Sequence, residues 1–168
     1  MKTPYIKKTG CGPIPQRKDG YMATRKMAAE AGHTKRVFIC TPFRGLGSTE
    51  AEAKKNFYDN LKLAKYACRY ATLKGFIPYA PHLYFPRFLM DHDPNERDMG
   101  RCYGLMWLAQ CDELWMIGRE ASEGMKTELE KAREWGIPIK LYVPERTPEE
   151  RLLDAIFFPE IKFHEMTD

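Results

Sequence analysis

Glu128 is the residue whose position in the sequence most clearly suggests chemistry. Residues 122–136 predict an amphipathic helix, in which successive side chains are rotated by about 100°. Its apolar arc consists of Ala121, Met125, Leu129, Ala132 and Trp135. Glu128 falls inside this arc, where an unpaired ionised carboxylate would cost on the order of several kcal/mol. We therefore expect Glu128 to be neutralised, to be paired with an arginine such as Arg97 or Arg101, or to face a cleft.

The residues before Glu128 favour the cleft. Gly124 lies one turn earlier on the same side of the predicted helix, so no side chain covers the approach to the carboxylate. Ser122 and the free amides of the first helical turn would lie beside it. The spacing alone leaves both an open site and an ion-paired glutamate possible.

A second candidate follows the first apolar run of the chain. The segment Thr41-Pro42-Phe43-Arg44-Gly45-Leu46-Gly47-Ser48 combines two glycines, an arginine and hydroxyl groups just before a predicted helix. Such a segment suits an anion at the N-terminus of a helix. It matches neither the phosphate-binding loop that ends in Gly-Lys-Ser/Thr nor the G-x-G-x-x-G fingerprint. Taken alone the signal for an anion site is weak, and an ordinary strand-to-helix turn is the simpler interpretation.

The segment after residue 80 contains further titratable and aromatic side chains. His82 could be a structural residue, or it could line a base-stacking wall together with Tyr84 and Phe85. Asp91, His92 and Asp93 suit an exposed turn and a helix cap better than a metal site. We expect Asp93 to cap a helix, with Glu96 returning the hydrogen bond as in a capping box. We predict no metal and no cofactor.

The elements that position these residues alternate along the chain. Predicted strands at 37–40, 76–80, 113–117 and 137–143 alternate with predicted helices at 49–74, 93–110 and 122–136, and a short helix follows residue 147. Pro78 favours an edge or irregular position for the second strand. This order indicates an α/β fold, a Rossmann/flavodoxin-like three-layer sandwich with a mostly parallel sheet of four or five strands. Segments 41–47, 81–84 and 118–128 would then meet at the carboxyl edge of the sheet, where such folds bind ligands.

Composition limits the class of protein. The chain has 168 residues, of which 43% are hydrophobic and 30% charged, and no apolar run approaches the ~20 residues of a membrane span. Five scattered cysteines predict reduced thiols and a cytoplasmic location. Residues 1–35 predict a basic, largely irregular leader with a short helix near 21–32, and residues 36–168 one α/β domain. Aromatic residues are sparse in the leader, so we do not expect a nucleic-acid partner.

The motifs together resemble a known family. Thr41-Pro42-Phe43 after the first strand is similar to the opening segment of nucleoside 2-deoxyribosyltransferases and related nucleotide N-glycosidases. The pattern from Cys111 to Pro138, including Ser122-x-Gly124-Met125-x-x-Glu128, resembles their nucleophile region. With the segment 80–86, it is most similar to an uncharacterised bacterial and phage branch of that superfamily. The resemblance covers about residues 36–143.

The resemblance implies that Glu128 attacks the anomeric carbon of a nucleoside or nucleotide and forms a covalent glycosyl-enzyme. Asp91 or His82 is then the candidate acid for the departing base, and Arg44 could bind a 5′-phosphate in bidentate fashion. The implied substrate-binding residues are Thr41, Pro42, Phe43, Arg44, Gly45, Tyr84, Gly118, Ser122, Gly124 and Met125. The resemblance also implies a homo-oligomer.

Two alternatives remain open at the level of sequence. The chain lacks a clear Asp-Ser-Gly run before the glutamate, which leaves room for a non-catalytic nucleotide-binding or sensing module. Gly124-Met125-Lys126-Thr127-Glu128 also faintly resembles the G-x-G-T-x-x-E motif of cytokinin-activating phosphoribohydrolases, although the second glycine is missing.

Overall fold

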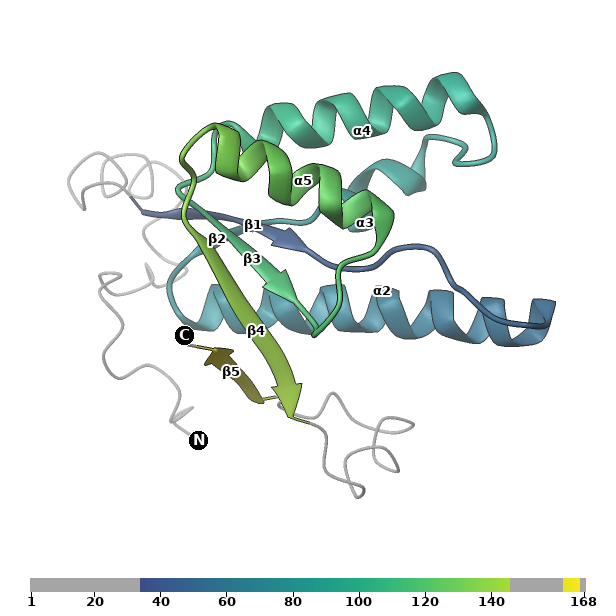
Figure 1. The fold of residues 1–168 in the computed structure, drawn as a ribbon, viewed down its shortest axis with the longest axis horizontal. Coiled ribbons are helices and arrows are strands. Elements are labelled where there is room, and N and C mark those ends of the chain that lie inside the picture. The colour runs from purple at the N-terminus through teal and green to yellow at the C-terminus, as the bar shows by residue number, and fades with distance from the viewer. Residues whose placement is uncertain (1–33, 146–161, 167–168) are drawn as a thin grey trace, which may run out of the picture.

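The computed structural model describes residues 34–145 and 162–166 (Figure 1). These residues form a five-stranded sheet with the strand order β2-β1-β3-β4-β5. The strands are β1 (Arg36–Cys40), β2 (Ile77–Tyr79), β3 (Glu113–Ile117), β4 (Ile139–Glu145) and β5 (Lys162–Met166). The first four are mutually parallel, whereas β5 pairs antiparallel with β4. The predicted α/β fold with a mostly parallel sheet is therefore confirmed.

Helices cover both faces of the sheet. They are α2 (Glu50–Leu73), α3 (Pro81–Tyr84), the 3-10 turn η1 (Phe85–Arg87), α4 (Pro94–Leu108) and α5 (Glu123–Glu134). Figure 1 shows α2 along one face of the sheet and α4 with α5 along the other. This arrangement requires strands that are apolar on both sides. The alternation in β1 meets that requirement, because Val37 and Ile39 belong to the α2-side cluster and Phe38 and Cys40 to the α5-side cluster.

Local sequence signals account for the helix ends. Thr49 and Glu52 form a capping box at the start of α2. The Asp93 side chain caps α4 by accepting hydrogen bonds from the amides of Asn95 and Glu96, as expected. Glu96 does not return the bond to Asp93. Its Oε2 instead accepts from the Met90 amide at 2.7 Å, because the preceding segment folds back over the first turn of the helix.

Two other expectations about the elements need correction. Trp135 is 42% exposed and does not join the apolar face of α5. The helix ends at Glu134, and Trp135 occupies its C-cap, where the chain has already left the helical path. The strand β5 was not predicted. Within the sheet formed by residues 34–145 and 162–166, β2 lies at an edge, in agreement with the prediction from Pro78. The predicted helices near 21–32 and after 147 lie outside the described residues.

Candidate active site

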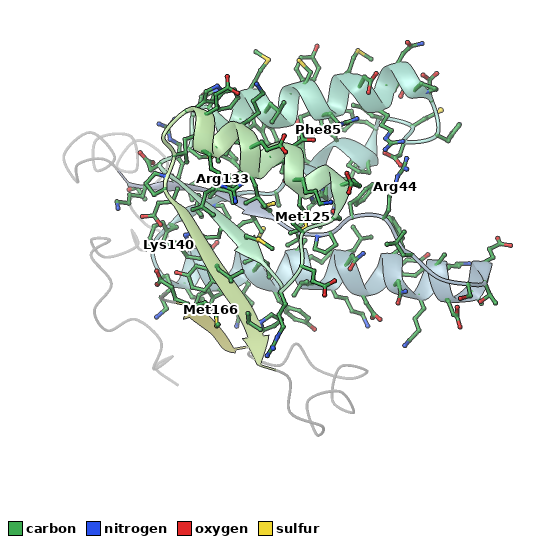
Figure 2. All side chains as sticks on the ribbon, in the orientation of Figure 1. Arg44, Phe85, Met125, Arg133, Lys140 and Met166 are labelled. Atoms are coloured by element: carbon green, nitrogen blue, oxygen red, sulfur yellow. The ribbon has the colours of Figure 1, made fainter. Side chains whose placement is uncertain are left out.

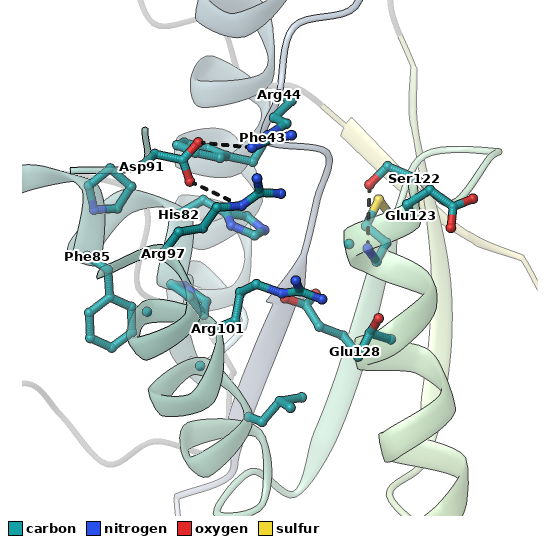
Figure 3. A pocket seen from close by; sticks show the side chains of 18 of the residues that line it. Phe43, Arg44, His82, Phe85, Asp91, Arg97, Arg101, Ser122, Glu123 and Glu128 are labelled. Carbon is teal, nitrogen blue, oxygen red and sulfur yellow. Dashed lines mark hydrogen bonds and ion pairs between the residues drawn. The ribbon is translucent and has the colours of Figure 1, made fainter. Parts of the chain in front are cut away.

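A cavity of about 940 Å³ opens at the carboxyl edge of the sheet. The strand order places the topological switch point between β1 and β3, where the chain segments that follow the two strands diverge. The cavity lies at this point, between the segment after β1, the α3–α4 region and the first turns of α5 (Figure 3). The residues on which the site is built are Thr41, Phe43, Arg44, His82, Phe85, Asp91, Arg97, Arg101, Leu105, Ser122, Gly124, Met125 and Glu128.

Glu128 projects from α5 into this cavity (Figure 3). Its Oε2 is buried and has no hydrogen-bond partner among the described residues. No guanidinium in the described part of the chain lies within ion-pair distance of Glu128, so the arginine-paired alternative does not hold there. Burial raises the pKa of Glu128 to about 7, although a hydrogen bond with the Cys40 thiol and the charge of Arg101 both act to lower it.

The start of α5 leaves the approach to Glu128 open. Ser122 is the N-cap, and its hydroxyl accepts a hydrogen bond from the Met125 amide at 3.5 Å. A Cβ added at Gly124 would meet no atom within 4 Å, so there is open space at this position of the cavity wall. Met125 is buried between α5 and the sheet and contributes to the floor of the cavity. Met125 lies in the first turn of α5 (Figure 2), and its packing in the core holds the start of the helix in place.

His82 and Phe43 form one wall. Their rings stack with centroids 5.4 Å apart and planes 16° apart, and Phe57 supports Phe43 edge-on at 5.3 Å. Burial lowers the pKa of His82 to about 4, although a hydrogen bond with the Thr41 backbone and the charge of Asp91 raise it. The imidazole is therefore neutral near pH 7. Its Nε2 and the Thr41 hydroxyl are both buried without a hydrogen-bond partner among the described residues, and both residues line the cavity.

Asp91 lies at the mouth of the cavity between two arginines. Its Oδ2 is 3.7 Å from Nη2 of Arg44, and its Oδ1 is 3.9 Å from Nε of Arg97 (Figure 3). Arg101 lies one turn further along α4 and extends toward Glu128. Its only ion pair among the described residues is with Asp98 on the same helix, at 3.9 Å.

Nine of the thirteen candidate residues from the sequence line this one cavity, and four do not. Pro42, Gly45, Tyr84 and Gly118 are the four outside it. The ring of Tyr84 packs against Phe88 and Trp107 at 5.0 Å and 5.1 Å and is about half exposed. Gly45 has a positioning role instead, because a Cβ there would lie 1.7 Å from the Ala53 carbonyl oxygen.

Arg97 and Arg101 line the cavity, although the sequence pattern indicates them only as possible ion-pair partners of Glu128. Both lie on the face of α4 that lines the cavity, with Leu105 one turn further along. Their spacing places both on one side of the helix, because residues four apart share a side, but it does not show that this side faces the cavity. Gly104 on the same helix faces Pro81, because a Cβ there would make ordinary van der Waals contact with the proline ring at 3.4 Å.

Comparisons with known proteins identify a matching family model and a distantly similar solved structure. No curated protein matches the sequence significantly. Among solved structures, the 2-deoxyribosyltransferase from the psychrotolerant bacterium Bacillus psychrosaccharolyticus is similar, with 16% identity and a TM-score of 0.42. The match covers 71% of this chain and 81% of that one. A likeness this distant carries no inference about function.

The helices of the described residues include none that is long and apolar enough to cross a bilayer. The family model of the domain of unknown function DUF7768 matches residues 35–142, a range that contains every candidate residue named above. The chain therefore belongs to the DUF7768 family.

Proposed function

We propose that this protein cleaves the N-glycosidic bond of a nucleoside or nucleotide, as an N-glycosidase or a (deoxy)ribosyltransferase, with Glu128 as the nucleophile. The observation that carries the proposal is the buried carboxylate oxygen of Glu128, which faces a large cavity and has no hydrogen-bond partner among the described residues. A buried polar atom without a partner costs free energy, so it is retained where a ligand uses it. The resemblance of residues 111–138 to the nucleophile region of the deoxyribosyltransferases supplies the reaction class.

The proposed chemistry proceeds in two steps. The ionised carboxylate of Glu128 attacks the anomeric carbon, and the C–N bond to the base breaks as the ester bond to Glu128 forms. Water or a second nucleobase then attacks the same carbon and releases the carboxylate. Weak hydration of the buried carboxylate makes it a better nucleophile. Since the pKa of Glu128 is raised to about 7, the rate of base release is expected to rise with pH through this value.

The base is proposed to stack against the Phe43–His82 wall. The neutral imidazole of His82 offers an unpartnered Nε2, which can accept a hydrogen bond from an N–H group of the base. Because its pKa is lowered to about 4, His82 does not carry the proton that a departing base needs at neutral pH. In this proposal Asp91 is the remaining candidate acid, and it would have to leave Arg44 and Arg97 to act.

The test is base release by wild type and Glu128→Ala across nucleosides and their 5′-monophosphates, followed by chromatography. We expect release by wild type and a loss of at least about a thousandfold in Glu128→Ala, as for a removed nucleophile. Glu130→Ala, an exposed position on the same helix, is the matched control and should keep full activity. Full base release by Glu128→Ala would exclude the nucleophile role.

The alternative is a non-catalytic module that binds a nucleotide in the same cavity. One observation favours it: burial keeps His82 neutral near pH 7, and the Asp91 carboxylate faces the guanidinium groups of Arg44 and Arg97, so neither side chain is placed to protonate a leaving base. Thermal-shift screening with nucleosides and nucleotides separates the two functions. Stabilisation by a ligand that is recovered unchanged after prolonged incubation supports the binding module. Consumption of each stabilising ligand supports the enzyme.

A further inference from the structure

We propose that Arg44, Arg97 and Arg101 form an anion subsite in this cavity, and that its ligand is the 5′-phosphate of a nucleotide. This inference deepens the proposed function and rests on it, because it takes the same cavity as the substrate site. It names the substrate class as nucleoside 5′-monophosphates rather than free nucleosides.

The first argument is the way in which Asp91 is held. Its two carboxylate oxygens face two different guanidinium groups, at 3.7 Å and 3.9 Å. Well-formed charge-assisted hydrogen bonds between such groups are about 2.7–2.9 Å long. The Asp91 carboxylate is therefore paired only loosely with Arg44 and Arg97. A phosphate has more oxygens and a larger radius, and it matches the planar donor pattern of two guanidinium groups better than one carboxylate does.

The second argument is that the three arginines come from two elements and meet at one opening. Arg44 is supplied by the segment after β1, whereas Arg97 and Arg101 stand one turn apart on the same face of α4. The Asp98 partner of Arg101 has a side chain that is 77% exposed, and the two groups are 3.9 Å apart. Such a pair is weak in water, so Arg101 can exchange it for a ligand at little cost.

The third argument is that two other acidic side chains of the lining, Glu96 and Glu123, are held by partners of their own. Glu96 accepts the Met90 amide at 2.7 Å, and Glu123 is paired with Lys126 on α5. Neither has to be displaced for an anion to enter. Asp91 is the one carboxylate of the lining that bridges Arg44 and Arg97, and an incoming phosphate would replace it there.

The fourth argument is the relation of the arginines to Glu128. Figure 3 shows Glu128 on the α5 side of the cavity and the arginines on the opposite side. In a pentose ring the anomeric carbon lies on one side of the ring oxygen, and the ring carbon that bears the 5′ carbon lies on the other side. A sugar phosphate can therefore present its reacting carbon to Glu128 while its phosphate faces the arginines. Arg101 is near enough for its charge to act on the carboxyl group of Glu128, so the two subsites adjoin.

The test measures binding in the Glu128→Gln background, where the proposed nucleophile is absent and ligands stay intact. The probes are ribose 5-phosphate and 2-deoxyribose 5-phosphate with the corresponding free sugars, inorganic phosphate, and nucleoside 5′-monophosphates with the matching nucleosides. Titration calorimetry at low ionic strength gives the affinities. We expect each phosphorylated probe to bind at least about tenfold tighter than its unphosphorylated partner, as for one or two charge-assisted hydrogen bonds.

Substitutions of the arginines and of Asp91 should change the affinity for 5′-monophosphates in opposite directions. Arg44→Gln and Arg97→Gln should each weaken binding of the 5′-monophosphates about tenfold and leave nucleoside binding within about twofold. Asp91→Asn should strengthen binding of the 5′-monophosphates, since it removes the competing carboxylate. Arg133→Gln, on α5 away from Arg44 (Figure 2), is the control for the change in net charge and should have no effect.

Several results would overturn the inference. Equal affinities for nucleosides and their 5′-monophosphates would do so, as would the absence of binding by every phosphorylated probe. Inorganic phosphate that binds as tightly as the sugar phosphates would indicate a general anion site.

If the 5′-monophosphates bind as expected but wild type releases no base from them, the subsite stands and the catalytic proposal fails. If wild type cleaves nucleosides and Arg97→Gln changes nothing, catalysis stands and the subsite fails.

Discussion

At the scale of single residues, the cost of keeping Glu128 in the cavity can be measured directly. Burial raises its pKa from 4.5 to about 7, so the folded protein binds this proton more tightly than the unfolded chain does. The free energy of unfolding should therefore be unaffected by this group below about pH 4.5 and should fall as the pH rises through about 7. The shift corresponds to at most about 3 kcal/mol.

Glu128→Gln removes this ionisation, and we predict that it stabilises the protein by about 1–3 kcal/mol at pH 8 and changes little at pH 5. Urea unfolding at both pH values is the measurement. Glu130→Gln, at an exposed position on α5, is the control and should show no such pH dependence. A Glu128→Gln variant that loses stability at pH 8 would mean that the carboxylate is stabilised by a cation after all.

The sequence indicated which residues are unusual and which segments meet at the carboxyl edge of the sheet, but it did not indicate which residues of α4 join them. Glu128 could be identified because a charge inside an apolar arc conflicts with the helical pattern. Arg97 and Arg101 could not be identified as site residues from the sequence. Charged residues on a helix normally face solvent, and α4 carries several of them. Their assignment to the site depends on which side of α4 faces α5, and that is decided by tertiary packing.

At the scale of elements, the first turn of α5 combines a helix cap with access to Glu128. Gly124 is the residue that links the two. Alanine favours the helix more than glycine does, and a Cβ at this position meets no atom within 4 Å. We therefore expect Gly124→Ala to stabilise the protein by about 0.5 kcal/mol. In Gly124→Leu, the larger side chain should restrict the approach to Glu128.

Carbodiimide labelling with peptide mass spectrometry measures this access without a known substrate. The labelling rate of Glu128 should fall in Gly124→Leu, while that of the exposed Glu130 in the same peptide should stay constant. Unchanged labelling of Glu128 in Gly124→Leu would mean that ligands reach the carboxylate from another side. Thermal unfolding of both variants provides the accompanying stability measurement.

The elements themselves were mostly predictable, and the exceptions have physical reasons. Glu113–Ile117 was predicted with its observed bounds because a continuous apolar run between polar residues suits a strand that is buried on both faces. Strand β5 was missed because an edge strand is held mainly by backbone hydrogen bonds, which impose little pattern on its side chains. Trp135 was misplaced because a helical wheel does not show where the helix ends.

At the scale of the whole molecule, β5 pairs with β4 and so keeps β4 from being an edge strand of the described sheet. It covers β4 over the register Leu141↔Met166 to Glu145↔Lys162. Side chains add to the pairing, because the Tyr142 hydroxyl donates to Glu165 at 3.1 Å and Lys140 lies 3.6 Å from the same carboxylate. Without β5, the parallel strand β4 would become an edge with unpaired backbone groups, which is a common starting point for aggregation.

Deletion of residues 162–168 is therefore predicted to lower the free energy of unfolding by about 2–4 kcal/mol, the net worth of a few backbone hydrogen bonds and the packing around Tyr142. Urea unfolding measures the loss, and light scattering as a function of concentration should reveal association of the shortened chain.

Glu165→Gln is the matched control. It removes only the exposed charge pair, so it should cost less than about 1 kcal/mol and leave the chain unassociated. If the deletion costs no more than Glu165→Gln, the backbone pairing of β5 contributes nothing to stability. The cavity lies at the β1–β3 switch point, away from this edge, so ligand binding per folded molecule should be the same in both variants.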